Sequence, residues 1–225
     1  MNNTYKDLVL QTFNFPQEDY DLKEDYLQYN GVDVKALIEK YGTPLKFSFL
    51  PKIGMQITKA KKMFANAIKK HKYEGEYFYC YCTKSSHFSF IVEEALKSKI
   101  HLETSYAYDI DIINKLFEGK KINKDIFIIC NGYKQKPYIS RIARLLNTGF
   151  KNVIPVLDNK AELAAYRKSV RVPFNIGIRV AAEEEPTFPF YTSRLGIRIK
   201  DILEFLVDYF IEFTPVINII FNALV

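Results

Sequence analysis

Two patterns of apolar positions follow each other along the chain, and the first covers about the first seventy residues. Residues 1 to about 30 read as irregular structure and short strands, with a turn at Asn30-Gly31. Apolar positions at helical spacing predict a helix that runs to Tyr41 and ends at Gly42. A strand over 45–50 and a lysine-rich helix over about 56–70 are predicted next, with a domain boundary between them.

From Glu76 onward, short apolar runs rich in β-formers alternate with segments of helical period. This alternation predicts a parallel sheet, and uninterrupted apolar strands predict that both faces of the sheet are covered. The predicted strands are 77–83, 101–104, 125–130, 153–157, 174–180 and 216–221, with helices around 88–96, 113–117, 139–146, 162–166 and 202–210.

Such a sheet can stay open and doubly wound, or it can close into a (β/α)₈ barrel. The chain contains neither G-x-G-x-x-G nor G-x-x-x-x-G-K-[ST], which weakens the case for a nucleotide-binding open sheet. A barrel fits better but is incomplete, because residues 77–225 hold at most six strands against roughly eight in a typical barrel. The predicted fold is therefore α/β, with an N-terminal segment (1–50) and a partial TIM-like barrel of about five to six βα units (51–225).

Composition removes several function classes. The net charge of +6 comes from lysines scattered at helical spacing, and no aromatic cluster is interleaved with a basic stripe, so no nucleic-acid partner is expected. Cys80, Cys82 and Cys130 lack disulfide or zinc-ligand spacing, which favours buried thiols in a reducing cytoplasm and no metal. The start has no secretion-signal pattern, and the uncharged stretch 214–225 is too short to span a membrane.

Polar residues at the carboxyl ends of the predicted strands are the candidates for chemistry, because barrel enzymes place catalysis at that end. They are Lys84, Glu103, Asn131, Asp158 and Arg179. A lysine, a carboxylate and an arginine around one cavity suit a cofactor with an aldehyde and a charged ring. Spacing alone still favours chance placement for each of them, and Asp158 looks like the N-cap of the next helix.

Six motifs in a defined order favour a functional role over chance placement. They are Tyr41-Gly42-Thr43-Pro44-Leu45, Tyr81-Cys82-Thr83-Lys84-Ser85-Ser86, His101-Leu102-Glu103-Thr104-Ser105, Cys130-Asn131-Gly132-Tyr133-Lys134, Ile176-Gly177-Ile178-Arg179-Val180 and Ser193-Arg194-Leu195-Gly196-Ile197. Together they resemble the fold-type III pyridoxal-phosphate decarboxylases that act on ornithine, diaminopimelate and arginine. Two stretches, 83–87 and 181–186, look most similar to the biosynthetic arginine decarboxylase branch.

The resemblance implies a barrel of the alanine racemase type and a defined set of roles. Lys84 would hold pyridoxal 5′-phosphate and act as the catalytic lysine, Glu103 would lie near the cofactor ring, and Arg179 would lie near the cofactor. The implied reaction is decarboxylation of an amino acid, most similar to conversion of arginine to agmatine and CO₂ in polyamine biosynthesis. The acidic run 183–185 could attract a guanidinium group, although a solvated loop explains it as well. A cytoplasmic homodimer or higher homo-oligomer is implied for the full-length form.

The sequence also departs from the family pattern. Tyr106 stands where relatives usually carry Ser or Gly, which would place a bulky ring close to the mouth. After Ile197 we find no counterpart of the family's cofactor-stacking histidine, Gly-rich phosphate loop, ring-nitrogen acid or β-domain, and the stretch 213–225 does not resemble the expected family strand. Two hypotheses stay open: the N-terminal portion of an arginine decarboxylase, or a truncated non-catalytic homologue that binds a full-length decarboxylase subunit.

Overall fold

The computed structural model describes residues 19–23, 26–181, 196–204 and 219–222. Contacts divide the chain into two compact units, Met1–Phe49 and Leu50–Val225. The predicted domain division into an N-terminal segment over 1–50 and a second domain over 51–225 stays a prediction.

In its described residues, the first unit contains a small antiparallel sheet and one helix. Strands β1 (Tyr20–Lys23), β2 (Tyr26–Tyr29) and β3 (Val32–Asp33) pair in sequence order, and helix α2 spans Val34–Tyr41. Asn30 and Gly31, with φ of 48° and 78°, form the predicted two-residue turn between β2 and β3. Asp33 caps α2 by accepting a hydrogen bond from the Ala36 amide at 3.0 Å, and Gly42 ends the helix as predicted.

The strand predicted over 45–50 does not form. Residues 45–49 carry neither helix nor strand, and within the described residues no strand pairs with them. Apolar alternation alone cannot supply the backbone partners that a strand needs. Pro51 does not interrupt a strand but begins helix α3 (Pro51–His71), where a proline fits because its missing N–H would have no partner anyway.

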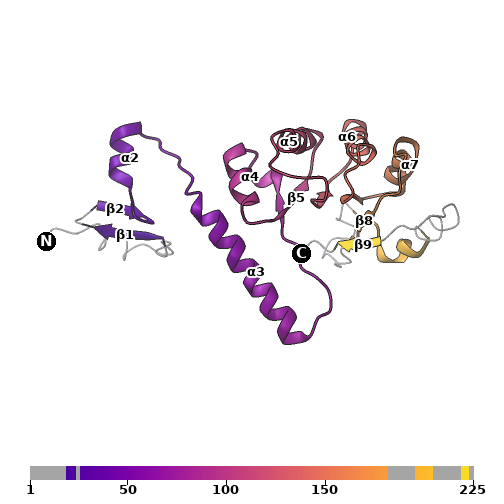
Figure 1. Ribbon diagram of the computed structural model, residues 1–225, viewed down its shortest axis with the longest axis horizontal. Coiled ribbons are helices and arrows are strands. Elements are labelled where there is room, and N and C mark those ends of the chain that lie inside the picture. The colour runs from indigo at the N-terminus through magenta and orange to yellow at the C-terminus, as the bar shows by residue number, and fades with distance from the viewer. Residues whose placement is uncertain (1–18, 24–25, 182–195, 205–218, 223–225) are drawn as a thin grey trace, which may run out of the picture. The chain divides into compact units, whose positions relative to one another are not determined.

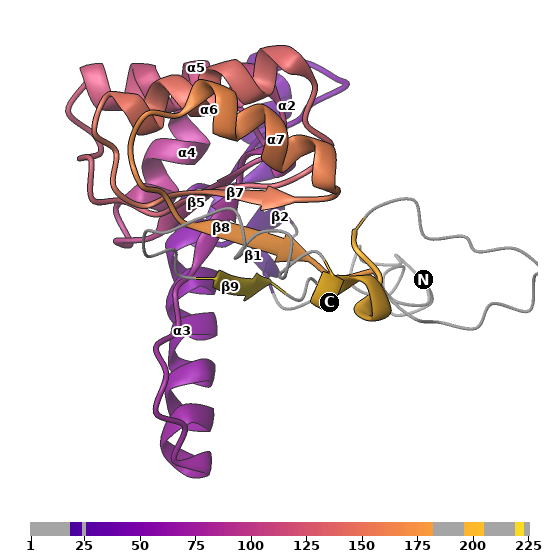
Figure 2. The same ribbon diagram turned by 90° about the vertical axis from the view of Figure 1, so that its right-hand side faces the viewer.

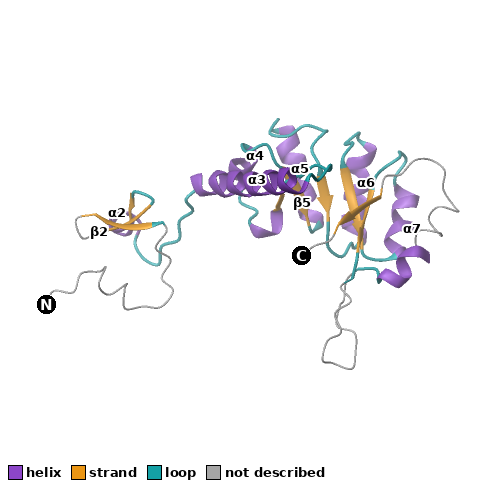
Figure 3. Ribbon diagram, turned by 90° about the horizontal axis from the view of Figure 1, so that it is seen from below, coloured by secondary structure: helices purple, strands orange, loops and turns teal. Residues whose placement is uncertain are grey.

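The second unit is built on a parallel sheet with the strand order β4-β5-β6-β7-β8-β9. The strands are β4 (Cys80–Cys82), β5 (His101–Thr104), β6 (Ile128–Cys130), β7 (Val153–Leu157), β8 (Ile176–Arg179) and β9 (Ile219–Asn222). The helices between them are α4 (Ser89–Leu96), α5 (Ala107–Glu118), α6 (Lys136–Asn147) and α7 (Lys160–Ser169). Figures 1 and 2 show α4 to α7 side by side over one face of the sheet, and Figure 3 separates the strands and helices by colour.

The core lies between the sheet and this helix layer. Leu102, Ile128, Val153 and Ile176 from four neighbouring strands are fully buried and pack in one apolar cluster with side chains of α4 to α7. Side chains alternate along a strand, so His101 and Glu103, which are half-buried, belong to the opposite face of β5. That face is the inner face of the incomplete barrel.

The predicted β/α alternation is confirmed, with shorter strands than the apolar runs suggested. The run 77–83 contributes only Cys80–Cys82 to the sheet, and 125–130 only Ile128–Cys130. Residues 199–204 are helical, while 205–210 and 216–218 of the predicted last helix and strand lie outside the described residues. In the described part of the chain, no helix is long and apolar enough to cross a membrane.

His101, on the inner face of β5, makes the stability of the fold depend on pH. Its Nδ1 accepts a hydrogen bond from the Phe127 amide at 3.2 Å, which requires Nδ1 to be unprotonated. Burial, assisted by the positive charge of Lys61, lowers the pKa of His101 below its ordinary value of 6.5. The unfolded chain therefore binds more protons than the folded one around that pH, and stability falls as pH decreases below about 6.5.

Urea unfolding at about pH 7.5 and about pH 5.5 measures this dependence. We expect the loss of unfolding free energy at the lower pH to be smaller in His101→Gln than in the wild type. His71→Gln, at the exposed end of α3, should leave the loss unchanged. A His101→Gln protein with the full wild-type pH dependence would contradict the assignment.

Candidate active site

Lys84 lies at the carboxyl end of β4, in the single 3₁₀ turn η1 (Thr83–Ser85). Thr83 anchors this turn, because its buried hydroxyl donates a hydrogen bond to the Glu103 carbonyl at 3.1 Å. The Lys84 side chain is exposed, and within the described residues no hydrogen bond or ion pair holds its ammonium group. The turn thus fixes the backbone of Lys84 and leaves its amine free to reach a ligand.

Glu103 and Asn131 meet next to this turn. Cys82 is paired in register with Glu103, and the Asn131 amide nitrogen donates to Glu103 Oε1 at 3.2 Å. Asn131 is only 4% exposed, and its Oδ1 has no hydrogen-bond partner among the described residues. A buried acceptor without a partner costs free energy. It is therefore a position where a ligand donor would be favoured.

Asp158 and Arg179 form a second group, at the ends of β7 and β8. Arg179 Nη1 lies 3.8 Å from Asp158 Oδ1, and the buried Lys134 Nζ lies 4.0 Å from Asp158 Oδ2. The prediction that Asp158 caps the next helix is wrong, because Asn159 is the N-cap and accepts a hydrogen bond from the Glu162 amide at 3.1 Å. Asp158 is left as a buried carboxylate whose described ion-pair partners are two cations.

The structure places the five predicted residues at one end of the sheet, in two groups. Glu103 joins Asn131 beside the turn of Lys84, and Asp158 joins Arg179, while no described contact links the two groups. Sequence reasoning missed the buried Lys134 and Glu162 that support the second group. The Asn159-x-x-Glu162 spacing is a helix-start signal that could have drawn attention to Glu162. The acidic run 183–185 lies outside the described residues.

Asp109 holds together the loops that follow β4 and β5. It is 1% exposed, and its Oδ2 accepts hydrogen bonds from the amides of Ser105 at 2.7 Å and Tyr106 at 3.1 Å. Its Oδ1 lies 2.9 Å from Nε2 of His87, a residue in the loop after Lys84. One buried carboxylate therefore fixes both loops that flank the candidate lysine.

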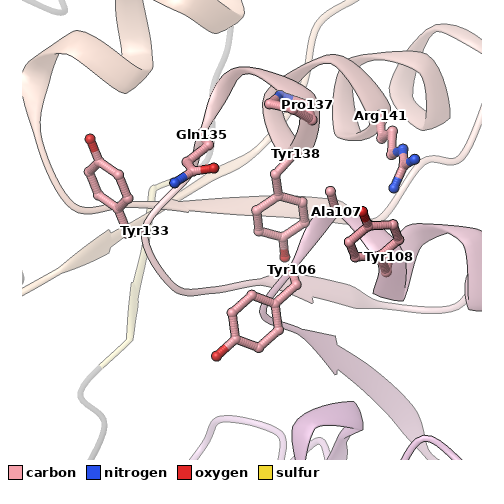
Figure 4. Close-up of a pocket in the computed structure, with 8 residues that line it drawn as sticks. All are labelled: Tyr106, Ala107, Tyr108, Tyr133, Gln135, Pro137, Tyr138 and Arg141. Carbon is pink, nitrogen blue, oxygen red and sulfur yellow. The ribbon is translucent and has the colours of Figure 1, made fainter.

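A pocket of about 330 Å³ lies between the first turns of α5 and α6 (Figure 4). The exposed ring of Tyr106 lines it, together with Tyr108, Tyr133 and Arg141. The Arg141 guanidinium already lies 3.0 Å from Asp111 and over the Tyr108 ring. None of the five predicted site residues is among the residues that line this pocket.

The three cysteines are poor nucleophiles at neutral pH. Burial raises the pKa of Cys80 and of Cys130 to about 11, and that of Cys82 is raised by the same cause. Among the described residues, no group of three or more His, Cys, Asp or Glu side chains is arranged to hold a metal ion. The described cysteine thiols are therefore disfavoured as nucleophiles.

No protein-family model matches the chain. The biosynthetic arginine decarboxylase of Bacteroides thetaiotaomicron is 26% identical over 192 residues, which cover 78% of this chain and 30% of that protein. That of Trichlorobacter lovleyi is 27% identical over 191 residues, covering 77% and 29%. In fold, the chain resembles diaminopimelate decarboxylase from M. jannaschii, solved with L-lysine, with a TM-score of 0.72 at 14% identity over 91% of this chain and 47% of that one.

These similarities decide between the two sheet closures. The sheet is part of a (β/α) barrel of the kind seen in the diaminopimelate decarboxylase, so the predicted incomplete barrel is confirmed. In sequence and fold the chain is similar to the N-terminal part of fold-type III pyridoxal-phosphate decarboxylases, as its motifs indicated. It spans 19–30% of the length of the curated arginine decarboxylases that it matches.

The residues at this end of the sheet fit pyridoxal phosphate in their chemistry. An amine suits an aldehyde, while a carboxylate and a guanidinium suit a charged ring and a phosphate. The buried Asn131 Oδ1 without a partner adds a position where a ligand hydrogen bond would be favourable. Lys84, Glu103, Asn131 and Arg179 are therefore the described residues that could hold such a group.

Proposed function

We propose that this chain binds pyridoxal 5′-phosphate at the carboxyl end of its sheet and takes part in the decarboxylation of an amino acid. The observation that carries the proposal is the exposed Lys84, placed at the end of β4 by a buried threonine anchor and set beside a carboxylate that Asn131 orients. The sequence similarity to arginine decarboxylases points to the same chemistry.

Each residue has a role in this proposal. The amine of Lys84 holds the cofactor, Glu103 lies at its ring, and Arg179 supplies a positive charge toward an anionic group. When bound, the cofactor supplies an electron sink for the electron pair left behind by departing CO₂. Asn131 holds the Glu103 carboxylate through its 3.2 Å hydrogen bond, and Asp109 fixes the loops on either side.

Arginine is the proposed substrate, because several curated relatives that cover 77–78% of this chain are biosynthetic arginine decarboxylases. The product would be agmatine, a polyamine precursor. Assembly as a homodimer or higher homo-oligomer in the cytoplasm belongs to the same proposal.

Release of CO₂ from labelled arginine, ornithine and diaminopimelate in the presence of pyridoxal phosphate tests this function. We expect release from arginine in preference to the other two, and loss of release to background in Lys84→Ala. Lys115→Ala, an exposed lysine on α5, should retain full activity. Release that survives in Lys84→Ala would contradict the proposed role of the lysine.

A second candidate function is a non-catalytic subunit that binds a complete decarboxylase. In the described part of the chain, β4 and β9 are the outer strands of the parallel sheet, and unpaired strand edges favour a partner. Binding of pyridoxal phosphate without CO₂ release, together with co-elution with a full-length arginine decarboxylase, would favour this function over catalysis.

A further inference from the structure

Lys134 is a buried lysine that the proposed chemistry does not use directly. Its side chain is fully buried, and its ammonium group donates hydrogen bonds to the Gly132 carbonyl at 2.8 Å, to the Val156 carbonyl and to Glu162 Oε2 at 3.2 Å. These acceptors come from the loop after β6, from β7 and from α7. Lys134 therefore joins two neighbouring βα units.

The charges around Lys134 balance only when all four groups are counted. Lys134 and Arg179 carry two positive charges, and Asp158 and Glu162 carry two negative charges. The Lys134, Asp158 and Glu162 side chains are at most 4% exposed, while that of Arg179 is 27% exposed. Arg179 is thus the member of the group that reaches solvent at the mouth.

Asp158 is shared between the two cations. One of its oxygens lies 3.8 Å from Arg179 and the other 4.0 Å from Lys134, and neither oxygen accepts a hydrogen bond from a described residue. Opposite charges interact strongly in such a poorly solvated place. Without Lys134, Asp158 would keep Arg179 as its described ion-pair partner and would draw the guanidinium charge inward.

We propose that Lys134 is a positioning residue, which offsets one of the two negative charges of Asp158 and Glu162 and so limits the pull of these carboxylates on the guanidinium of Arg179, which stays available to an anionic ligand at the mouth. The inference rests on the proposed function, in which Arg179 faces the cofactor, and deepens it by naming the buried group on which that role depends. Lys134 acts through Asp158 and Arg179 and touches no ligand itself.

Three variants separate this role from a merely structural one. Lys134→Met removes the buried charge, Asp158→Asn removes the carboxylate beside Arg179 without breaking a described side-chain hydrogen bond, and the double variant combines both. The dissociation constant of pyridoxal 5′-phosphate is measured by calorimetry for each folded variant. We expect Lys134→Met to bind at least about tenfold more weakly, and the double variant to return to within roughly threefold of wild type. Asp158→Asn alone should bind no more weakly than wild type.

A ligand-free readout keeps failure of this inference distinct from failure of the proposed function. Hydrogen exchange of the Arg179 Nε–H, followed by NMR and assigned with Arg179→Lys, should slow in Lys134→Met and recover in the double variant. Exchange rates that do not change in Lys134→Met, or a folded double variant that stays as perturbed as Lys134→Met, would overturn the inference. Absence of pyridoxal phosphate binding by the wild type would instead count against the proposed function, and the exchange rates would still decide the role of Lys134.

Discussion

Replacement of Lys134 by methionine is expected to lower the free energy of unfolding by about 3–5 kcal/mol, because it leaves a buried carboxylate without its cation. Glu162 is 3% exposed, and it accepts hydrogen bonds from Lys134 Nζ and from the backbone amides of Lys134 and Asp158. Methionine fills a similar volume, so the loss reflects charge and hydrogen bonding rather than a cavity. Urea unfolding followed by circular dichroism measures it.

Lys151→Met is the matched control for this prediction. Lys151 pairs with Asp125 at 3.3 Å, but both side chains are more than half exposed, so its replacement should cost less than about 1 kcal/mol. If the two lysine variants lose the same small amount, the buried network does not hold the two βα units together as described.

Asp109→Ala is the second large effect that we expect, at about 3 kcal/mol. The change removes the acceptor of the buried Ser105 amide and of the partly buried Tyr106 amide, and a buried donor left without a partner costs roughly 1–3 kcal/mol. Since Asp109 also holds His87, the loop that follows Lys84 loses a support. Urea unfolding measures the stability, and proteolysis near residue 87 reports on the loop.

His87→Ala provides the comparison for Asp109. The His87 side chain is 51% exposed, and its removal leaves both backbone amides bonded to Asp109, so we expect a loss of no more than about 1 kcal/mol. Equal losses in the two variants would show that the hydrogen bond to His87, and not the loop amides, dominates the contribution of Asp109.

The sequence predicted the order of elements well, because burial of one face imposes a period that can be read locally. The strands 101–104 and 153–157 have the predicted bounds, and the turn at Asn30-Gly31 follows from its residue types. The predicted strand 45–50 failed for a different reason. A strand depends on a partner that is remote in sequence, and the period of a segment does not show whether that partner exists.

The candidate site was predicted in part. Strand-end position brought out Lys84, Glu103, Asn131, Asp158 and Arg179, and the structure confirms that they lie at one end of the sheet. Their assignment to the cofactor stays a prediction. The buried pair of Lys134 and Glu162 could not be found in this way, because the two residues are 28 positions apart and meet only when β6 and β7 pair. Charged residues are common on surfaces, so sequence alone gave no sign that these two are buried.

Covalent trapping of pyridoxal phosphate tests the central claim most directly. The chain is incubated with pyridoxal 5′-phosphate, reduced with borohydride, digested and analysed by mass spectrometry. With less than one equivalent of cofactor, we predict one phosphopyridoxyl group, on the peptide that contains Lys84. This label should be lost in Lys84→Ala and kept in Lys115→Ala. Label spread over the exposed lysines, or an unchanged label in Lys84→Ala, would contradict the account.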